Sequence, residues 1–172
     1  MENRNTLQQS YNRRTLLRDI AVTVLITTLL VGFIFNIVIV NGTSMKPTLR
    51  DGSIILTNHI APNVDHGSIV VCNTDNFGER LIKRVIGCPG DTVDIDFNEG
   101  VVYLNGDPLN EPYTYAKTYS CPDDATELPV TLGENCYFLM GDNRNNSIDS
   151  RNAVVGIIHR NDILSSYICT IF

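Results

Sequence analysis

The feature that constrains this chain most is a long uncharged stretch near its start. Ile20 to Val40 contains 21 residues, mostly Val, Ile, Leu and Phe, and none of them carries a charge. As a helix with a rise of ~1.5 Å per residue, this stretch would be about 31 Å long, close to the ~30 Å hydrocarbon thickness of a bilayer. It therefore predicts a transmembrane helix over residues 20–40.

Two other interpretations of the stretch are a buried core helix and the apolar region of a cleaved signal peptide. A core helix in so small a protein is rarely apolar on every side. A signal-peptide apolar region is typically ~7–15 residues long and precedes a small-x-small cleavage site, whereas Val40-Asn41-Gly42 follows here. A retained membrane anchor fits the length and the flanks better than either.

Charge differs sharply on the two sides of the stretch. Residues 1–19 carry a net charge of +2, and the residues after the stretch carry -8. By the positive-inside rule, we expect residues 1–19 to lie in the cytoplasm and residues 41–172 to form an extracytoplasmic domain, so that the lipid bilayer is one partner. The formal charge of the whole chain, -6, has the wrong sign for a protein that neutralises phosphates, so nucleic acid is not an expected partner.

The residues after the stretch predict an all-β domain. The chain has 172 residues, of which 43% are hydrophobic, enough for one folded domain plus an appendage. From Ser53 onward, short apolar runs rich in β-branched residues alternate with turn formers, as is typical of strands. Hairpin turns are expected at Asn98-Glu99-Gly100 and Asn105-Gly106-Asp107, and residues 111–130 should leave the sheet. The expected strands contain residues 54–56, 69–71, 81–82, 85–86, 93–95, 101–104, 137–140, 154–158 and 163–171.

Five cysteines are an odd number for a domain expected outside the cytoplasm, so at least one is free or pairs between chains. Cys121 and Cys136 flank a polar loop and could form a bridge, but unpaired buried thiols are an equal alternative. None of the cysteines has zinc-ligand spacing. We therefore expect neither a metal nor another cofactor.

Three polar segments carry the residues that could perform chemistry. The first, Asn41-Gly42-Thr43-Ser44-Met45-Lys46-Pro47-Thr48-Leu49, directly follows the uncharged stretch. In the second, around Lys83 and Arg84, two cations stand next to each other in an apolar strand, so one of them should face the interior. The third, residues 140–151, places hydroxyl, carboxylate and guanidinium groups within one loop, where they could form a hydrogen-bond network.

Together and in this order, the three segments resemble the bacterial type I signal peptidases, membrane-bound Ser/Lys endopeptidases that release secreted proteins from their signal peptides. The matching stretches are Gly-Thr-Ser-Met-Lys-Pro-Thr-Leu, Ile-Lys-Arg-Val-Ile-Gly-Cys-Pro-Gly-Asp and Gly-Asp-Asn-Arg-Asn-Asn-Ser-Ile-Asp-Ser-Arg. The resemblance covers the anchor and nearly all of the following domain. It implies a mainly β fold of the signal-peptidase and LexA-like type, the second group being self-cleaving Ser/Lys repressors.

The resemblance also implies residue roles. Ser44 would be the nucleophile, Lys83 the general base and Ser147 a hydroxyl that orients the lysine. On chemical grounds alone, the hydroxyl of Ser150 could also donate to the uncharged amine. Some family members have an oxyanion-binding serine where this chain has Gly42, so a main-chain N–H, a water molecule or the Thr43 hydroxyl would replace it. Met45 would border a substrate pocket for small residues, commonly Ala, at the first and third positions before the cut. Structural support would come from Arg84, Asp142, Asp149 and Arg151, with Asp142 pairing Arg84.

The chemistry requires these residue types on its own grounds. A serine hydroxyl is a weak nucleophile until a base takes its proton, and a lysine can do this only when neutral. Apolar surroundings lower the lysine pKa, and Ile82, Val85 and Met45 would provide them. The expected substrates are precursor proteins that carry signal peptides.

Two other functions remain open at this stage. One is a hydrolase with a histidine base, using His59, His66 or His159. None of these histidines has a supporting motif, and lone histidines are usually structural or exposed. The other is a membrane-tethered β domain that only binds a partner, in which Ser44 belongs to a linker and Lys83 is exposed.

Overall fold

The computed structural model describes residues 2–74, 78 and 80–172, and it divides into two units, residues 1–36 and 37–172. In the first unit, α1 (Glu2–Ile34) is a helix that contains a candidate membrane span, Arg13–Ile34, within which an 18-residue window has a mean hydropathy of 2.0. Large apolar side chains of the span, including Leu16, Val24 and Phe33, are exposed, and none of that window is buried. By length and composition, the helix could cross a membrane.

The helix boundaries differ from those expected. The helix begins well before Ile20 and ends at Ile34, short of the expected end at Val40. Residues Phe35–Ile39 form strand β1 instead, next to β2 at the edge of a sheet. The β-branched residues Ile37, Val38 and Ile39 favour this extended backbone, and pairing in a sheet outweighs the apolar character that predicted helix.

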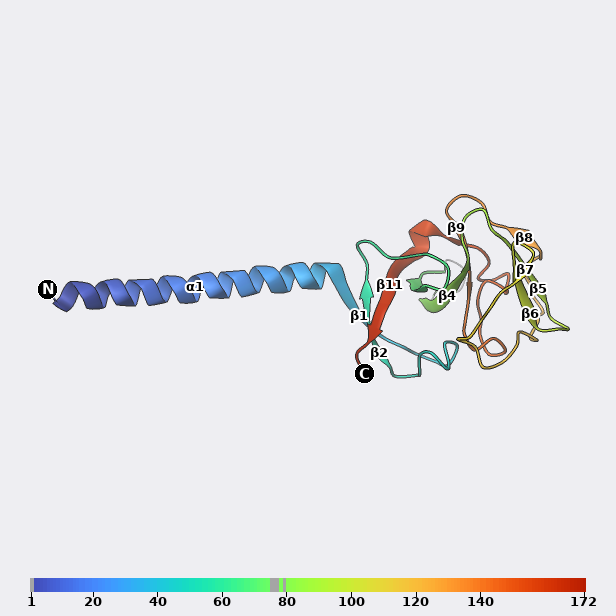
Figure 1. Cartoon of the computed structure of the whole chain (residues 1–172), viewed down its shortest axis with the longest axis horizontal. Helices are drawn as coiled ribbons and strands as arrows, with labels where there is room; N and C mark the ends of the chain where they lie inside the picture. Colours follow the sequence, from blue (N-terminus) through green and yellow to red (C-terminus); the bar gives the residue numbers. More distant parts are fainter. Residues whose placement is uncertain (1, 75–77, 79) are drawn as a thin grey trace. The chain divides into compact units, whose positions relative to one another are not determined.

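The second unit contains two antiparallel sheets (Figure 1). In the described part of the chain, the larger sheet has seven strands in the order β1-β2-β11-β3-β4-β9-β10, and the smaller has four in the order β7-β6-β5-β8. The strands after β1 are β2 (Ile54–Asn58), β3 (Ile69–Cys72), β4 (Leu81–Gly87), β5 (Thr92–Asp96), β6 (Val101–Leu104), β7 (Asp107–Pro108), β8 (Val130–Thr131), β9 (Cys136–Met140), β10 (Ile158–His159) and β11 (Ile163–Thr170), with a 3-10 helix at Arg160–Asp162 before β11.

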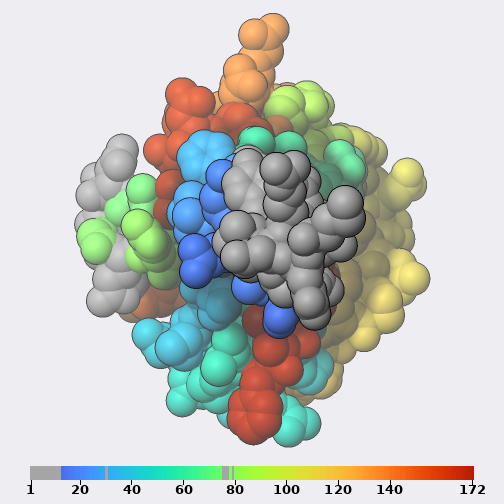
Figure 2. Space-filling model, turned by 90° about the vertical axis from the view of Figure 1, so that its left-hand side faces the viewer, coloured from blue at the N-terminus to red at the C-terminus, as the bar shows by residue number. Residues whose placement is uncertain are grey.

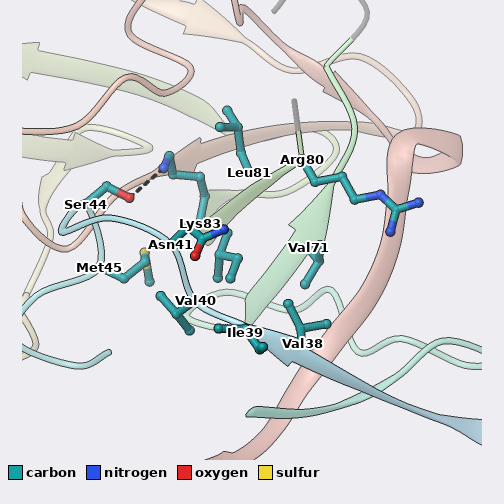
Figure 3. Close-up of a pocket in the computed structure, with 11 residues that line it drawn as sticks. Val38, Ile39, Val40, Asn41, Ser44, Met45, Val71, Arg80, Leu81 and Lys83 are labelled. Carbon is teal, nitrogen blue, oxygen red and sulfur yellow. Dashed lines mark hydrogen bonds between the residues drawn. The ribbon is translucent and has the colours of Figure 1, made fainter. Parts of the chain in front are cut away.

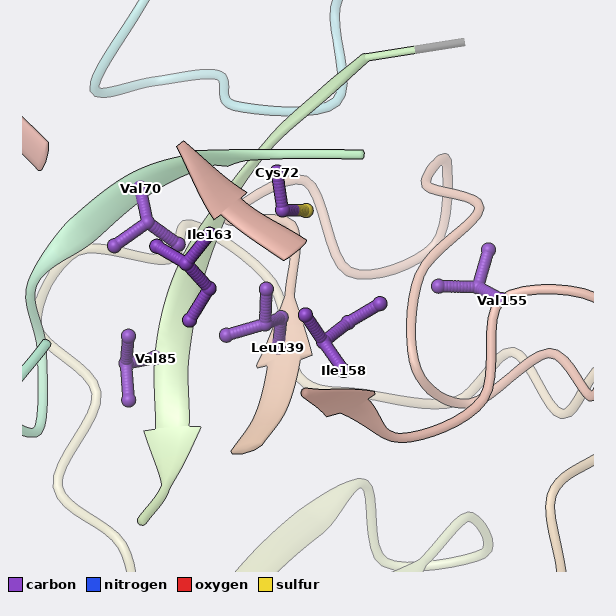
Figure 4. Packing of buried hydrophobic residues seen from close by; sticks show 7 residues of the cluster. All are labelled: Val70, Cys72, Val85, Leu139, Val155, Ile158 and Ile163. Carbon is purple, nitrogen blue, oxygen red and sulfur yellow. The ribbon is translucent and has the colours of Figure 1, made fainter. Parts of the chain in front are cut away.

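The two sheets share a core because β4 and β9 present apolar side chains on both faces. Val85 and Leu139 pack on one face with β3 and β11, as Figure 4 shows. Ile86 and Phe138, each one residue away, pack on the other face against the smaller sheet. This period of two is the pattern expected of strands buried on both sides.

The chain ends beside β2. β11 pairs with β2, and the Ile54 N–H donates to the carbonyl oxygen of Phe172 at 2.7 Å. In the space-filling view, the C-terminal residues, in red, lie at the surface against the turquoise residues that include β2 (Figure 2). The last strand, β11, thereby fixes β2, the strand that follows the segment containing Ser44.

The mainly β class is confirmed, but one expected strand is largely absent. Only Ile158 of the run 154–158 is in a strand. Gly156 has a φ of +60°, outside the extended region, and the N–H groups of Val155 and Gly156 both donate to the Asn152 carbonyl. The run is apolar because Val155 is buried in the core beside β9, and burial in a turn leaves the same sequence pattern as burial in a strand.

Candidate active site

The segment that follows β1 holds Ser44 next to a small apolar core. Met45 and Leu49 are each 1% exposed, and the Leu49 N–H donates to the Met45 carbonyl at 2.8 Å. Both side chains pack with Val40 and Ile55. Burial on either side of the turn therefore fixes where the Ser44 hydroxyl is presented.

Lys83 lies in the middle of β4, and its side chain reaches Ser44. The Lys83 amine is 2.9 Å from Ser44 Oγ, within hydrogen-bonding distance, as Figure 3 shows. Lys83 is only 3% exposed. Burial lowers the pKa of Lys83 because it disfavours the ammonium form, and the negative charge of Asp149 opposes this only in part. A buried amine is therefore in hydrogen-bond contact with an alcohol.

Arg84 points to the other side of β4 and forms the expected pair with Asp142. Its Nε and Nη2 donate to the two carboxylate oxygens at 2.8 and 2.6 Å, and Nη1 donates to the Gly67 carbonyl at 2.7 Å. Thr48 donates its hydroxyl to the same carboxylate at 2.5 Å. Asp142 thus connects β4 to the segment that carries Ser44.

Asp149 and Arg151 form a second buried pair. Arg151 Nε donates to Asp149 Oδ1 at 2.8 Å, and the Gly141 N–H donates to Asp149 Oδ2 at 2.9 Å. Burial would raise the pKa of Asp149, but the hydrogen bonds and charge of Arg151 outweigh it and lower the pKa. The carboxylate is therefore held ionised. Ser150 lies in the same loop, where its hydroxyl accepts the Leu139 N–H at 3.0 Å.

Ser147 lies against the loop glycine Gly141. Its Oγ is buried, and the Ser147 hydroxyl helps to lower the pKa of the nearby Asp149 carboxylate, but among the described residues it forms no hydrogen bond to Lys83. A Cβ at Gly141 would come within 2.2 Å of Ser147 Oγ and 2.6 Å of the Ser44 carbonyl oxygen. Only glycine leaves room for these two groups. The Ser147 hydroxyl keeps its capacity to donate.

Gly42 has a structural partner of its own. Its φ of +93° is in the region that favours glycine, and its N–H donates to Asp51 Oδ1 at 2.7 Å. The Gly42 N–H is therefore already bonded to Asp51, in the segment just before Ser44.

A cavity of about 520 Å³ opens beside the Ser44 and Lys83 pair. Figure 3 shows these two residues at one side of the cavity and Arg80 at the other. Its apolar lining comes from Val38, Ile39, Val40, Met45, Val71, Leu81 and Ile82. An extended, mostly apolar peptide segment would fit a cavity of this character.

The segment 111–130 contributes contacts that the sequence did not indicate. Arg144, 1% exposed, donates from Nη1 to Glu111 Oε2 at 2.8 Å. The Tyr113 hydroxyl donates to Glu111 Oε1 at 3.2 Å, and the Arg84 guanidinium carbon lies 4.1 Å from the centre of the Tyr113 ring. Residues 111 and 113 are about 30 positions from Arg84 and Arg144 in the chain. No local sequence pattern relates residues so far apart, so these contacts could not be predicted.

One group of possible metal ligands lies in the described part of the chain. One ligand atom from each of His66, Cys88 and Asp91 lies within 4.8 Å of the others. The Asp91 carboxylate already accepts His66 Nε2 at 2.6 Å, the Cys88 N–H at 2.7 Å and Asn105 Nδ2 at 2.8 Å. Hydrogen bonds therefore account for this arrangement. All five cysteines are unpaired, including Cys121 and Cys136.

Comparison with known proteins gives concordant matches. The sequence profile of the family described as "Signal peptidase, peptidase S26" matches residues 13–172. The chain is similar to "Signal peptidase I" of Bacillus amyloliquefaciens, at 38% identity over 80% of this chain and 76% of the relative. It is also 38% identical to "Signal peptidase I S" of Bacillus subtilis (strain 168), over 80% of this chain and 77% of the relative.

Among solved structures, a signal peptidase I from Enterococcus faecalis V583 is 27% identical, with a TM-score of 0.49, and the match covers 60% of this chain and 96% of that one. The family profile and the Bacillus relatives each extend over most of the chain, and the profile includes all three polar segments. The chain belongs to the signal peptidase family, peptidase S26.

Proposed function

We propose that this protein is a membrane-anchored signal peptidase that removes signal peptides from precursor proteins, with Ser44 as nucleophile and Lys83 as general base. The observation that carries the proposal is the buried Lys83 amine, 2.9 Å from the Ser44 hydroxyl. An amine accepts a proton only when it is neutral. Burial favours that state, because it lowers the pKa of Lys83.

The reaction proceeds through two acyl transfers. Lys83 takes the Ser44 proton while Oγ attacks the scissile carbonyl carbon, and the resulting ammonium protonates the leaving amine as the peptide C–N bond breaks. Water, deprotonated by the same amine, then attacks the ester carbonyl carbon. The bond between that carbon and Ser44 Oγ breaks, the Lys83 ammonium returns its proton to Oγ, and the acyl group leaves as a carboxylic acid. The Ser44 N–H is the first donor to the oxyanion, and the Thr43 hydroxyl is a candidate for the second.

The remaining site residues support this pair. Ser147 has a buried hydroxyl close to Asp149, and its role in this proposal is to orient the Lys83 amine. The pairs Arg84–Asp142 and Asp149–Arg151 hold the strand and loop that carry Lys83 and Ser147. Gly42 shapes the turn before the nucleophile, and Met45 borders the cavity.

The substrates are signal-peptide-bearing precursors cut after small residues at the first and third positions. The cavity beside Ser44 is bordered by apolar side chains, which suit an extended segment with small side chains. α1 supports membrane anchoring, because the candidate span Arg13–Ile34, whose uncharged part begins at Ile20, is about 33 Å long as a helix. With the basic N-terminal residues in the cytoplasm, the β unit is extracytoplasmic.

The decisive experiment incubates the full chain in detergent with a purified signal-peptide-bearing precursor. Ser44→Ala and Lys83→Met should each abolish cleavage, whereas Ser53→Ala and Lys117→Met, which alter a serine and a lysine elsewhere, should cleave at nearly the wild-type rate. Cleavage by Ser44→Ala or Lys83→Met at the wild-type rate would reject the proposal.

The same assay tests the two competing functions. His66 contacts Asp91, and His159 contacts Cys136. We expect the combined replacement of His59, His66 and His159 to retain cleavage, and a complete loss in a folded protein would favour a histidine base. A binding domain without activity requires an exposed Lys83, which disagrees with its burial.

A further inference from the structure

The peptide group that precedes the nucleophile is held on one side by Asn143. The Thr43 carbonyl oxygen accepts Asn143 Nδ2 at 3.1 Å and the Lys46 N–H at 3.1 Å. We propose that Asn143 is a positioning residue that aims the Ser44 N–H at the oxyanion of the transition state. This inference rests on the function proposed above and assigns Asn143 a role in the same site.

The argument follows from the planarity of the peptide bond. In a trans peptide, the carbonyl oxygen of one residue and the N–H of the next point in opposite directions in one plane. The Thr43–Ser44 bond is trans, so a partner that fixes the Thr43 oxygen also fixes the Ser44 N–H. That N–H therefore points away from the Asn143 amide.

The Ser44 N–H itself is unpartnered. Within the residues that the structure describes, it donates no hydrogen bond. Oxyanion donors must be in place before the negative charge develops. The Ser44 N–H meets this requirement, because it has no partner, lies next to the nucleophilic oxygen, and has its direction fixed by the hydrogen bond from Asn143 to the Thr43 carbonyl.

Asn143 also holds the next peptide group. Its backbone N–H donates to the Ser44 carbonyl oxygen at 2.9 Å. The side-chain orientation is defined by chemistry, because the Thr43 carbonyl can only accept and must face the NH₂ group. The Oδ1 atom faces the other way and accepts the Tyr115 hydroxyl at 3.2 Å. One residue thus holds the peptide groups on both sides of the nucleophile's Cα.

The hydrogen bond has an electrostatic effect as well as a geometric one. Donation to the Thr43 carbonyl polarises the peptide group and makes the Ser44 N–H a stronger donor. Loss of an oxyanion donor costs on the order of 10²–10³-fold in kcat. A donor that is present but points in the wrong direction should lower kcat by less than this, roughly 10- to 100-fold.

The test compares Asn143→Ala with Asn145→Ala in the full chain in detergent. Asn145 is the same residue type in the same loop, but its side chain bonds to the 117–120 segment. We expect Asn143→Ala to lower kcat about 10- to 100-fold with KM changed less than about twofold, and Asn145→Ala to stay within about threefold of wild type. Equal losses in the two variants would overturn the proposal.

Two inhibitors that differ only in whether they form an oxyanion test the contribution of the Ser44 N–H separately from the rest of binding. A substrate-like peptide aldehyde adds Ser44 Oγ to its carbonyl carbon, so that a charged oxygen faces the Ser44 N–H, whereas the corresponding peptide alcohol forms no such oxygen. We expect Asn143→Ala to weaken the aldehyde in proportion to the loss in kcat/KM and to leave alcohol binding unchanged. Equal weakening of both inhibitors, or an unchanged aldehyde affinity, would overturn the proposed role.

Two further measurements keep the outcome clear. If Asn143→Ala does not unfold cooperatively, Asn143→Asp replaces it, because it keeps the shape but puts an oxygen opposite the Thr43 carbonyl, and the same losses are expected. The pH at half-maximal kcat/KM should not move, since Lys83 is untouched, and a large shift would contradict the proposal. Activity in Ser44→Ala would refute the proposed function itself, whatever Asn143 does.

Discussion

The amine of Lys83 lies 2.9 Å from the hydroxyl oxygen of Ser44, although 39 positions separate the two residues in the chain. Ser44 follows the edge strand β1, whereas Lys83 belongs to β4, and β2, β11 and β3 stand between these strands in the sheet. Curvature of this sheet therefore creates the contact. The predictions that follow test what the contact and its surroundings do.

The rate of cleavage should depend on the protonation of Lys83. Since burial lowers its pKa from 10.5, kcat/KM should rise with pH and reach a plateau, with a midpoint below 10.5. The measurement is kcat/KM for one peptide substrate over a pH series in detergent. A profile that is flat down to acidic pH would exclude a titrating amine as the base.

Lys83→Met should unfold at higher denaturant concentration than the wild type at neutral pH. The unfolded chain binds a proton more readily than the folded one when the folded pKa is lowered, so wild-type stability rises with pH between the lowered pKa and 10.5. Lowering the folded-state pKa by one unit reduces the free energy of unfolding by about 1.4 kcal/mol at a pH below both pKa values. The gain of Lys83→Met should be largest at the lower pH and vanish toward pH 10.5. Denaturant unfolding followed by tyrosine fluorescence measures it, and a pH-independent gain would contradict this account.

Asp142→Asn should destabilise the β unit and reduce cleavage. The substitution leaves the buried Arg84 guanidinium without its counter-charge, and breaking a buried pair in this way typically costs about 3–5 kcal/mol. The matched control is Asp107→Asn, an exposed carboxylate in β7, which should change stability by less than about 0.5 kcal/mol. Comparable thermal unfolding of the two variants would show that the Arg84–Asp142 pair contributes little.

Gly141→Ala should lose at least about 100-fold in kcat/KM, because displacement of catalytic groups by about 1 Å has that effect. The new methyl group would lie 2.6 Å from the Ser44 carbonyl and 2.2 Å from Ser147 Oγ, so both must move. Gly133→Ala is the control, since its nearest neighbour would be 3.7 Å away, and it should remain active. Full activity in Gly141→Ala would mean that these groups can shift without consequence.

Most strands could be predicted from the sequence because short runs rich in β-branched residues are separated there by turn-forming residues. The runs in β2, β3, β5, β6 and β9 coincide with the observed strands, and Asn105 and Gly106 adopt the positive φ values expected of their turn. The end of α1 was not predictable, because residues 35–40 are as apolar as the helix before them. Their extended conformation depends on pairing in a sheet.

The site was predictable to a different extent. Ser44 and Lys83 were assigned by resemblance together with the chemistry of a neutral amine, and the fold brings them together. Arg84 stacks on the Tyr113 ring, and Asn143 donates to the Thr43 carbonyl. No local sequence pattern predicts either contact. Contacts of this kind depend on how loops pack onto the strands, which periodicity does not encode.

Lys83 and Arg84 occupy neighbouring positions of one strand and serve opposite sides of it. A shift of β4 by a single residue that placed Arg84 at the position of Lys83 would bring a guanidinium to Ser44 and would set the apolar side chain of Val85 opposite Asp142. A guanidinium stays charged at any physiological pH and cannot take a proton. Under the proposed mechanism, a one-residue insertion or deletion that shifted β4 in this way would therefore abolish cleavage even though Lys83 itself was retained, so the spacing along the strand matters as much as its composition.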